Sequence, residues 1–221
     1  MHFEFLVEDL SGSRMLEHII PKIIGTDSKN TFRIHRYRGC GSLPTGLKVK
    51  QAADKGALLN QLPKLLIGYS MAFQDCIADN AIIVVCDLDA RNKDVFLSEL
   101  NKKRDDALAL FASSLNVRFC LAIEEGESWF LGDWNAIKKA YPAAKANIFS
   151  KYKNDSICGT WEKLADMIYP GGAKKLKKLG HAVEGATKFE WAEKISPFMD
   201  ISNNKSPSFN DFKSTLESLK E

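Results

Sequence analysis

Carboxylate side chains directly follow three short, largely apolar segments of the sequence, at residues 3–7, 81–86 and 117–123. Segments of this kind, rich in β-branched and aromatic residues, predict strands of a buried sheet. Because the carboxyl ends of parallel strands share one edge of a sheet, acids far apart in the sequence are expected to converge on one rim. Clustered carboxylates repel one another, and hard oxygen ligands without histidine or thiolate suit Mg²⁺ or Mn²⁺. The acids expected at this rim are Glu8, Asp9, Asp87, Asp89, Glu124, Glu125 and Glu127.

Acids at strand ends also have simpler uses, as solvated loop residues and as helix caps. A single strand end would favour that interpretation, whereas three strand ends in succession favour a shared site. The Asp-x-Asp at residues 87–89 also occurs in nucleotide-sugar glycosyltransferases and in phosphatases. The phosphatase motif normally follows the first strand, and here the motif lies in mid-chain. The pattern therefore favours a metal site and leaves a transferase open.

Strands and helices alternate over the first part of the chain. A serine between residues 11 and 13 is expected to cap a first helix, and helical spacing predicts further helices over 56–78 and 94–115. Alternation of this kind predicts an α/β fold, in which a mostly parallel sheet is covered by helices. The predicted strands are residues 3–7, 31–37, 81–86 and 117–123.

From residue 133 onward the strand pattern stops and helical segments follow one another. We expect residues 133–221 to form a helical elaboration packed on the α/β core of residues 1–132, the two together making one compact domain. The helices predicted here cover residues 134–140, 161–169, 188–195 and 208–220, the last opened by a Ser208/Asp211 capping pair.

The composition is that of an ordinary globular protein. Of 221 residues, 45% are hydrophobic and 27% charged, and the formal net charge of +3 excludes a histone-like or polybasic protein. Five cysteines without a CxxC pair argue against a disulfide framework and a structural zinc site. The acidic start is unlike a signal peptide, and no apolar stretch is long enough to span a bilayer. We therefore expect a cytoplasmic protein without a membrane segment.

Four segments together resemble a known family. They are residues 5–8 (Phe-Leu-Val-Glu), 84–89 (Val-Val-Cys-Asp-Leu-Asp), 122–133 (Ala-Ile-Glu-Glu-Gly-Glu-Ser-Trp-Phe-Leu-Gly-Asp) and 206–209 (Ser-Pro-Ser-Phe). A strand followed by Glu and a later strand followed by Asp-x-Asp is similar to the TOPRIM domain of topoisomerases, primases and OLD-type nucleases. The full set resembles the small stand-alone TOPRIM-like proteins of the DUF4276 family.

The resemblance implies a Mg²⁺- or Mn²⁺-dependent centre that cleaves or transfers phosphodiesters. Glu8 would then act as general acid or base, and Asp87 and Asp89 would hold the metal. Glu127 matches the acid of a Glu-x-Trp motif and would also contact the metal, with Glu124 and Asp9 as weaker candidates. The family usually has glycine after the first glutamate, where this chain has Asp9. Family context further implies an ABC- or AAA-type ATPase partner in a bacterial or phage defence system.

Basic residues outside the acidic rim are candidates for contacts with nucleic-acid phosphates. Arg33, Arg36 and Arg38 lie on and after the second predicted strand, and Lys174 and Lys175 belong to a lysine cluster. Each group is also readily explained as solvated surface, because exposed arginine and lysine are normal. These residues are therefore secondary candidates.

The sequence thus favours a Mg²⁺-dependent nuclease that acts on DNA or RNA. It leaves open a non-catalytic interaction subunit of an ATPase complex, a metal-dependent nucleotide-sugar enzyme, and a nucleotide-binding module without hydrolysis. It also leaves open whether the chain forms a homo-oligomer.

Overall fold

The centre of the molecule is a parallel sheet, as the alternation of strands and helices predicts. The computed structural model describes residues 1–25, 29–47, 56–74, 79–111 and 113–220. Within them the sheet has the strand order β2-β1-β3-β4, all parallel. The predicted strands are confirmed to within one residue at either end. They are β1 (His2–Val7), β2 (Thr31–Arg36), β3 (Asn80–Asp87) and β4 (Asn116–Ala122).

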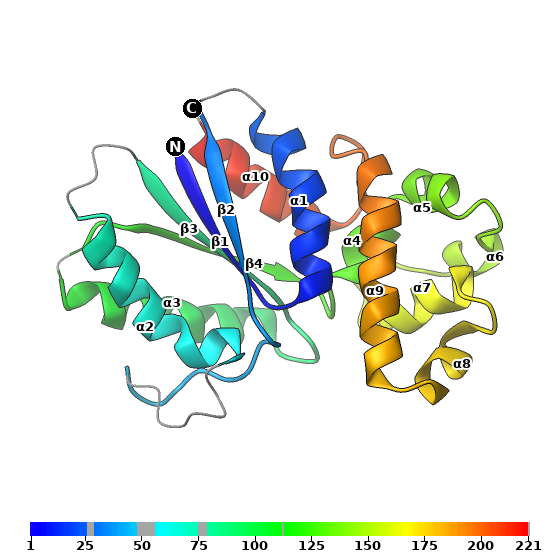
Figure 1. Cartoon of the computed structure of the whole chain (residues 1–221), viewed down its shortest axis with the longest axis horizontal. Coiled ribbons are helices and arrows are strands. Elements are labelled where there is room, and N and C mark those ends of the chain that lie inside the picture. The colour runs from blue at the N-terminus through cyan, green and yellow to red at the C-terminus, as the bar shows by residue number, and fades with distance from the viewer. Residues whose placement is uncertain (26–28, 48–55, 75–78, 112, 221) are drawn as a thin grey trace.

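Helices cover both faces of this sheet (Figure 1). On one face Phe5 joins a hydrophobic core with α1 (Leu10–Ile24) and α10 (Pro207–Leu219). On the other face the next residue, Leu6, packs with α2 (Leu58–Ala72) and α3 (Lys93–Ala109). Successive side chains of a strand point to opposite faces, so β1 buries apolar side chains on both sides. Burial of each large apolar side chain contributes roughly 1.5–3 kcal/mol.

The second half of the chain is helical, and its helices extend the first core. They are α4 (Glu127–Leu131), α5 (Trp134–Ala140), α6 (Ala146–Phe149), α7 (Thr160–Ile168), α8 (Gly172–Lys178), α9 (His181–Ile195) and the 3₁₀ helix η2 (Ser196–Phe198), followed by α10. Figure 1 shows α9 running alongside α1, with α5, α6, α7 and α8 gathered beyond it. Trp129 and Trp191 are both buried in the same core as Phe5.

Several predicted helix boundaries are wrong, each for a local reason. The first helix is capped by Asp9 rather than by a serine, since the Asp9 carboxylate accepts a hydrogen bond from the Gly12 amide. The last helix is capped by Ser206, because Pro207 is well suited to the first helical position. Helix α9 begins at His181, seven residues before the predicted start at residue 188.

Other predicted helices are shorter in the structure. The helix predicted over 56–78 is α2, and residues 75–78 lie outside the described part of the chain. The helix predicted over 94–115 ends at Ala109. None of the described helices is both long enough and apolar enough to cross a membrane.

Candidate functional site

Glu8 and Asp87 lie side by side at the carboxyl edge of the sheet. Val7 is aligned with Val85 on the neighbouring strand, so Glu8 follows β1 beside the point where β3 ends at Asp87. The Asp87 amide donates a hydrogen bond of 3.0 Å to Glu8 Oε2, and the Glu8 amide donates one of 3.2 Å to the Val85 carbonyl. The parallel register therefore brings together two acids that are 79 positions apart.

These two acids line a small pocket between the sheet edge, α1, α4 and α9. Its other charged side chains are Asp9, Glu127 and Lys188, and the rest of its lining is mostly apolar. Glu127 is the first residue of α4 and only 3% exposed. The apolar and small lining residues include Val7, Met15, Val85, Gly126, Trp129 and Phe130.

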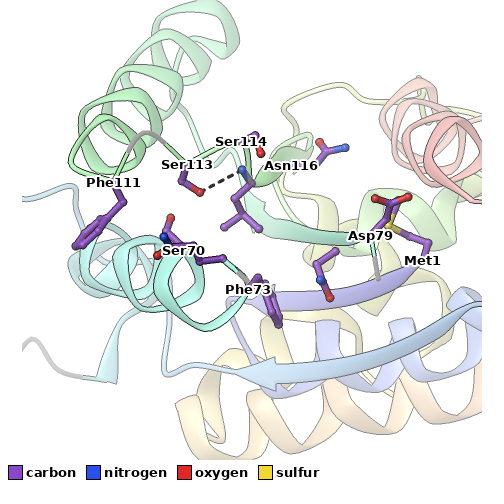
Figure 2. A pocket seen from close by; sticks show the side chains of 11 residues that line it. Met1, Ser70, Phe73, Asp79, Phe111, Ser113, Ser114 and Asn116 are labelled. Carbon is purple, nitrogen blue, oxygen red and sulfur yellow. Dashed lines mark hydrogen bonds between the residues drawn. The ribbon is translucent and has the colours of Figure 1, made fainter. Parts of the chain in front are cut away.

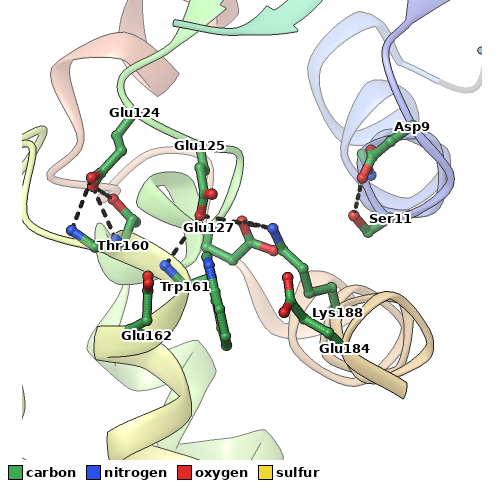
Figure 3. A network of polar contacts seen from close by, with 12 residues as sticks. Asp9, Ser11, Glu124, Glu125, Glu127, Thr160, Trp161, Glu162, Glu184 and Lys188 are labelled. Carbon is green, nitrogen blue, oxygen red and sulfur yellow. Dashed lines mark hydrogen bonds and ion pairs between the residues drawn. The ribbon is translucent and has the colours of Figure 1, made fainter. Parts of the chain in front are cut away.

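Lys188 supplies the positive charge of this pocket. It projects from α9, and its Nζ lies 3.3 Å from Glu127 Oε2 and 3.7 Å from Glu125 Oε2 (Figure 3). Glu125 also accepts a hydrogen bond of 3.3 Å from the Trp161 amide. Burial alone would lower the pKa of Lys188, but Glu127, Glu125 and Asp87 raise it above its usual value, so the side chain stays charged.

Lys188 is not among the site residues predicted from the sequence, although the sequence contains a signal for it. Trp191, Ala192 and Ile195 are buried and follow Lys188 at three, four and seven positions, so all four residues lie on one face of α9. A lysine on the apolar face of a helix needs a buried partner. The helix predicted over residues 188–195 contains all four residues, so this face could have been recognised from the sequence.

One lysine does not neutralise the carboxylates around it. Burial and the charges of Asp9 and Asp89 raise the pKa of Glu8, against the opposing hydrogen bond from the Asp87 amide. Burial and the charges of Glu8 and Glu127 raise the pKa of Asp87 well above its ordinary range. Loss of hydration raises the pKa of Glu125 to about 7, even though Lys188 lowers it. Burial likewise raises the pKa of Glu127. The pocket is short of positive charge.

Glu124 lies close in sequence but has a different environment. Its carboxylate accepts hydrogen bonds from the amides of Cys158, Gly159 and Thr160 at 3.0, 2.8 and 3.0 Å, and from the Thr160 hydroxyl. These donors form the start of α7. Partial burial opposes ionisation, but the hydrogen bonds hold the pKa of Glu124 below its usual value. Glu124 does not line the pocket and caps a helix.

The two acids of the Asp-x-Asp motif also differ in environment, as Glu124 differs from the pocket acids. Asp87 lines the pocket, whereas Asp89 is exposed and lies 3.2 Å from a guanidinium nitrogen of Arg91. An extended strand would place both side chains on one face. Asp89 instead has a φ of 53°, in the left-handed region, and its amide donates to the Glu124 carbonyl at 2.8 Å. This turn keeps Asp89 out of the pocket.

The secondary candidates among the basic residues lie on the surface outside this pocket. Arg33 and Arg36 are exposed on the edge strand β2, and Arg38 is exposed just after it. Lys174 and Lys175 are exposed on α8. None of these five residues lines the pocket of Glu8 and Asp87.

The donor chemistry of the pocket suits a hard divalent cation. Among the described residues, no group of three or more His, Cys, Asp or Glu side chains is arranged to hold a metal ion. Mg²⁺ does not need such a group, because it is commonly held by one or two carboxylates together with waters and substrate phosphates. Glu8 and Asp87 supply two adjacent carboxyl groups with unmet negative charge.

A second, larger cavity lies at the opposite edge of the sheet (Figure 2). It is lined mainly by uncharged side chains, among them Ser70, Phe73, Ser113 and Asn116. Asp79 is its one ionisable side chain within the described part of the chain. Because its described lining holds no cluster of charged side chains, this cavity is a weaker candidate than the acidic pocket.

Comparison with known proteins identifies a family but no activity. A family model described as "Domain of unknown function (DUF4276)" matches residues 7–217, which is nearly the whole chain. No curated protein and no solved structure matches the chain.

Proposed function

We propose that this chain, which belongs to the DUF4276 family, is a cytoplasmic Mg²⁺-dependent nuclease whose chemistry takes place at Glu8 and Asp87. One observation carries the proposal. Two carboxyl groups from distant parts of the sequence meet at the carboxyl edge of a parallel sheet, and both have a raised pKa. Strongly perturbed carboxyls in a pocket at such an edge are typical of functional sites.

The two acids would have different roles. Asp87, at the end of β3, would hold a Mg²⁺ or Mn²⁺ ion, with Glu8 beside it. A bound ion would polarise the phosphate and offset the charge that develops on it. Glu8 would accept or return a proton, since a raised pKa brings a carboxyl closer to neutral pH. The Asp87 amide fixes Oε2 of Glu8 and so orients this group.

The remaining parts of the proposal come from the resemblance to TOPRIM nucleases. They are a DNA or RNA substrate, an ABC- or AAA-type ATPase partner and a role in antiviral defence. A pocket with several carboxylates and one lysine repels phosphate by itself, so cleavage would depend strictly on the divalent cation.

A cleavage assay with a matched pair of variants tests the proposal. Labelled DNA and total RNA are incubated with the protein, with Mg²⁺ or Mn²⁺ and with EDTA. Asp87→Asn is expected to lower the rate at least about 100-fold, because it removes the carboxylate charge that would hold the metal ion in the transition state. Asp89→Asn, two residues away and outside the pocket, is expected to stay within about threefold of the wild type.

Two further results decide the interpretation. Glu8→Gln is expected to lose activity as Asp87→Asn does, with the circular dichroism spectrum unchanged. Equal activity of all variants, or activity that persists in EDTA, would contradict a metal-dependent site at these residues.

A second candidate is a non-catalytic subunit of an ATPase complex. The observation that favours it is the pairing of Lys188 with Glu125 and Glu127, which makes part of the acidic cluster a structural network. In that case Asp87→Asn would leave the function of the complex intact.

A further inference from the structure

Lys188 is paired with two carboxylates at one side of the pocket. Its ammonium group contacts the carboxylates of Glu127 and Glu125 at 3.3 and 3.7 Å, and its side chain is only 16% exposed. Glu127 is almost fully buried, at 3% exposed, so it cannot be neutralised by bulk solvent. Burial of an unpaired carboxylate is very costly, and Lys188 provides the required partner.

The surroundings hold Lys188 in this position. Its Nζ lies 6.0 Å from the centre of the Trp161 ring, and the Trp161 amide donates to the same Glu125 oxygen that Lys188 approaches. Helix α9 also lies against α1 (Figure 1), and this packing fixes the backbone from which the lysine projects. The ammonium group is therefore a tethered ion at high effective concentration.

The pocket is divided into two halves by this arrangement. Glu125 and Glu127 face Lys188, whereas Glu8 and Asp87 have no ion pair with any described lysine, arginine or histidine. Glu8, Asp87 and Glu127 line this pocket and Glu125 lies outside its lining, yet only the half with Glu125 and Glu127 has a lysine within ion-pair distance. Only the Glu8 and Asp87 half is left for a divalent cation.

We infer that Lys188 takes the place of a second divalent cation, so that the pocket binds one metal ion rather than two. This inference rests on the proposed function, because it presumes that Glu8 and Asp87 bind a metal. A second ion at Glu125 and Glu127 would have to displace the tethered ammonium group. Removal of that group opens a second site.

Calorimetric titration with Mn²⁺ tests the inference without any measurement of activity. The wild type is expected to bind one equivalent, and Lys188→Met two. The double variant Lys188→Met/Glu127→Gln is expected to return to one, because it removes a ligand of the new site. Lys194→Met serves as the matched control, since Lys194 lies on the same helix in an exposed pair with Glu190, and is expected to bind one equivalent.

Thermal unfolding in EDTA tests the counter-ion role separately. Lys188→Met leaves Glu125 and Glu127 without their counter-ion and is expected to lower the melting temperature by about 10 °C. Lys188→Met/Glu127→Gln is expected to recover at least about half of that loss. Lys188→Arg, which keeps the charge, is expected to bind one equivalent of Mn²⁺.

The outcomes separate this inference from the proposed function. Two equivalents in the wild type, or one in both the wild type and Lys188→Met, would overturn the role of Lys188 and leave the metal site standing. No Mn²⁺ binding by either protein would overturn both. An equal loss of melting temperature in the single and double variants would also overturn the counter-ion role.

Discussion

Glu124 and Glu125 are adjacent in the loop after β4, but their carboxylates have opposite environments. Glu124 has four hydrogen-bond donors for one carboxylate, and its pKa is lowered. One residue later, Glu125 has one amide at 3.3 Å and a lysine at 3.7 Å, and its pKa is raised to about 7. Both follow strand β4. The number of donors around an acid, rather than its position after a strand, therefore separates a carboxylate whose charge the fold stabilises from one whose charge it does not.

The same contrast appears after β3. Asp87 faces other acids in the pocket, whereas Asp89 is exposed beside Arg91. After each of these two strands, one carboxylate has partners that stabilise its charge and another does not. If the contrast is correct, removal of the first kind should cost stability, and neutralisation of the second kind should increase it.

The largest effect on stability is expected for Glu124→Ala. The variant leaves the amides of Cys158, Gly159 and Thr160 without an acceptor, and we expect a loss of about 3 kcal/mol in the free energy of unfolding. Urea denaturation at pH 7 measures this loss. Glu99→Ala, at an exposed position of α3, is the matched control and is expected to change stability by less than about 0.5 kcal/mol.

The stability that Glu124 contributes should depend on pH in a defined direction. Because its pKa is lowered in the folded state, the contribution is present above the ordinary value of 4.5 and is lost as the pH falls through the lowered pKa. The difference between wild type and Glu124→Ala should therefore shrink from pH 7 to pH 3. A difference that stays constant over this range would show that the carboxylate charge is not what holds α7.

A smaller effect of opposite sign is expected for Asp87→Asn. Replacement of a repelled carboxylate by an amide should raise the melting temperature in EDTA by about 3 °C, which corresponds to about 1 kcal/mol in a protein of this size. Asp89→Asn should leave the melting temperature nearly unchanged, because Asp89 is exposed and makes only a surface ion pair. A lower melting temperature for Asp87→Asn would mean that Asp87 is satisfied by the fold, as Glu124 is.

Much of the sheet could be predicted from the sequence. Three largely apolar segments, at residues 3–7, 81–86 and 117–123, became parallel strands because a sheet covered on both faces requires mostly apolar strands. The parallel register then brought Glu8 and Asp87 together. This part of the site follows from local pattern and strand topology alone.

The rest depends on contacts that the local sequence does not contain. Glu124 is satisfied by amides 34 to 36 residues further along the chain, and Asp89 turns away through one left-handed residue. Lys188 reaches the pocket only because α9 packs on α1. Long-range packing therefore decides which of the predicted acids face the pocket.

Asp9 tests this contrast most sharply, because its carboxylate lines the pocket and also accepts hydrogen bonds from its own helix. Its carboxylate accepts hydrogen bonds from the Gly12 amide at 2.7 Å and the Ser11 hydroxyl at 2.6 Å, as the N-cap of α1. Asparagine caps helices as well as aspartate does, so Asp9→Asn should change stability by less than about 0.5 kcal/mol, whereas Asp9→Ala should cost about 1 kcal/mol.

If a satisfied carboxylate is unavailable to a ligand, Asp9→Asn should also leave the Mn²⁺ affinity within about threefold of the wild type, which allows for the loss of one nearby charge. Asp87→Asn should abolish binding in the same titration. A loss of Mn²⁺ binding in Asp9→Asn equal to that in Asp87→Asn would break the contrast, because it would show that a capping carboxylate can leave its helix to hold the ion. Position in the pocket, and not the number of donors, would then identify the ligands.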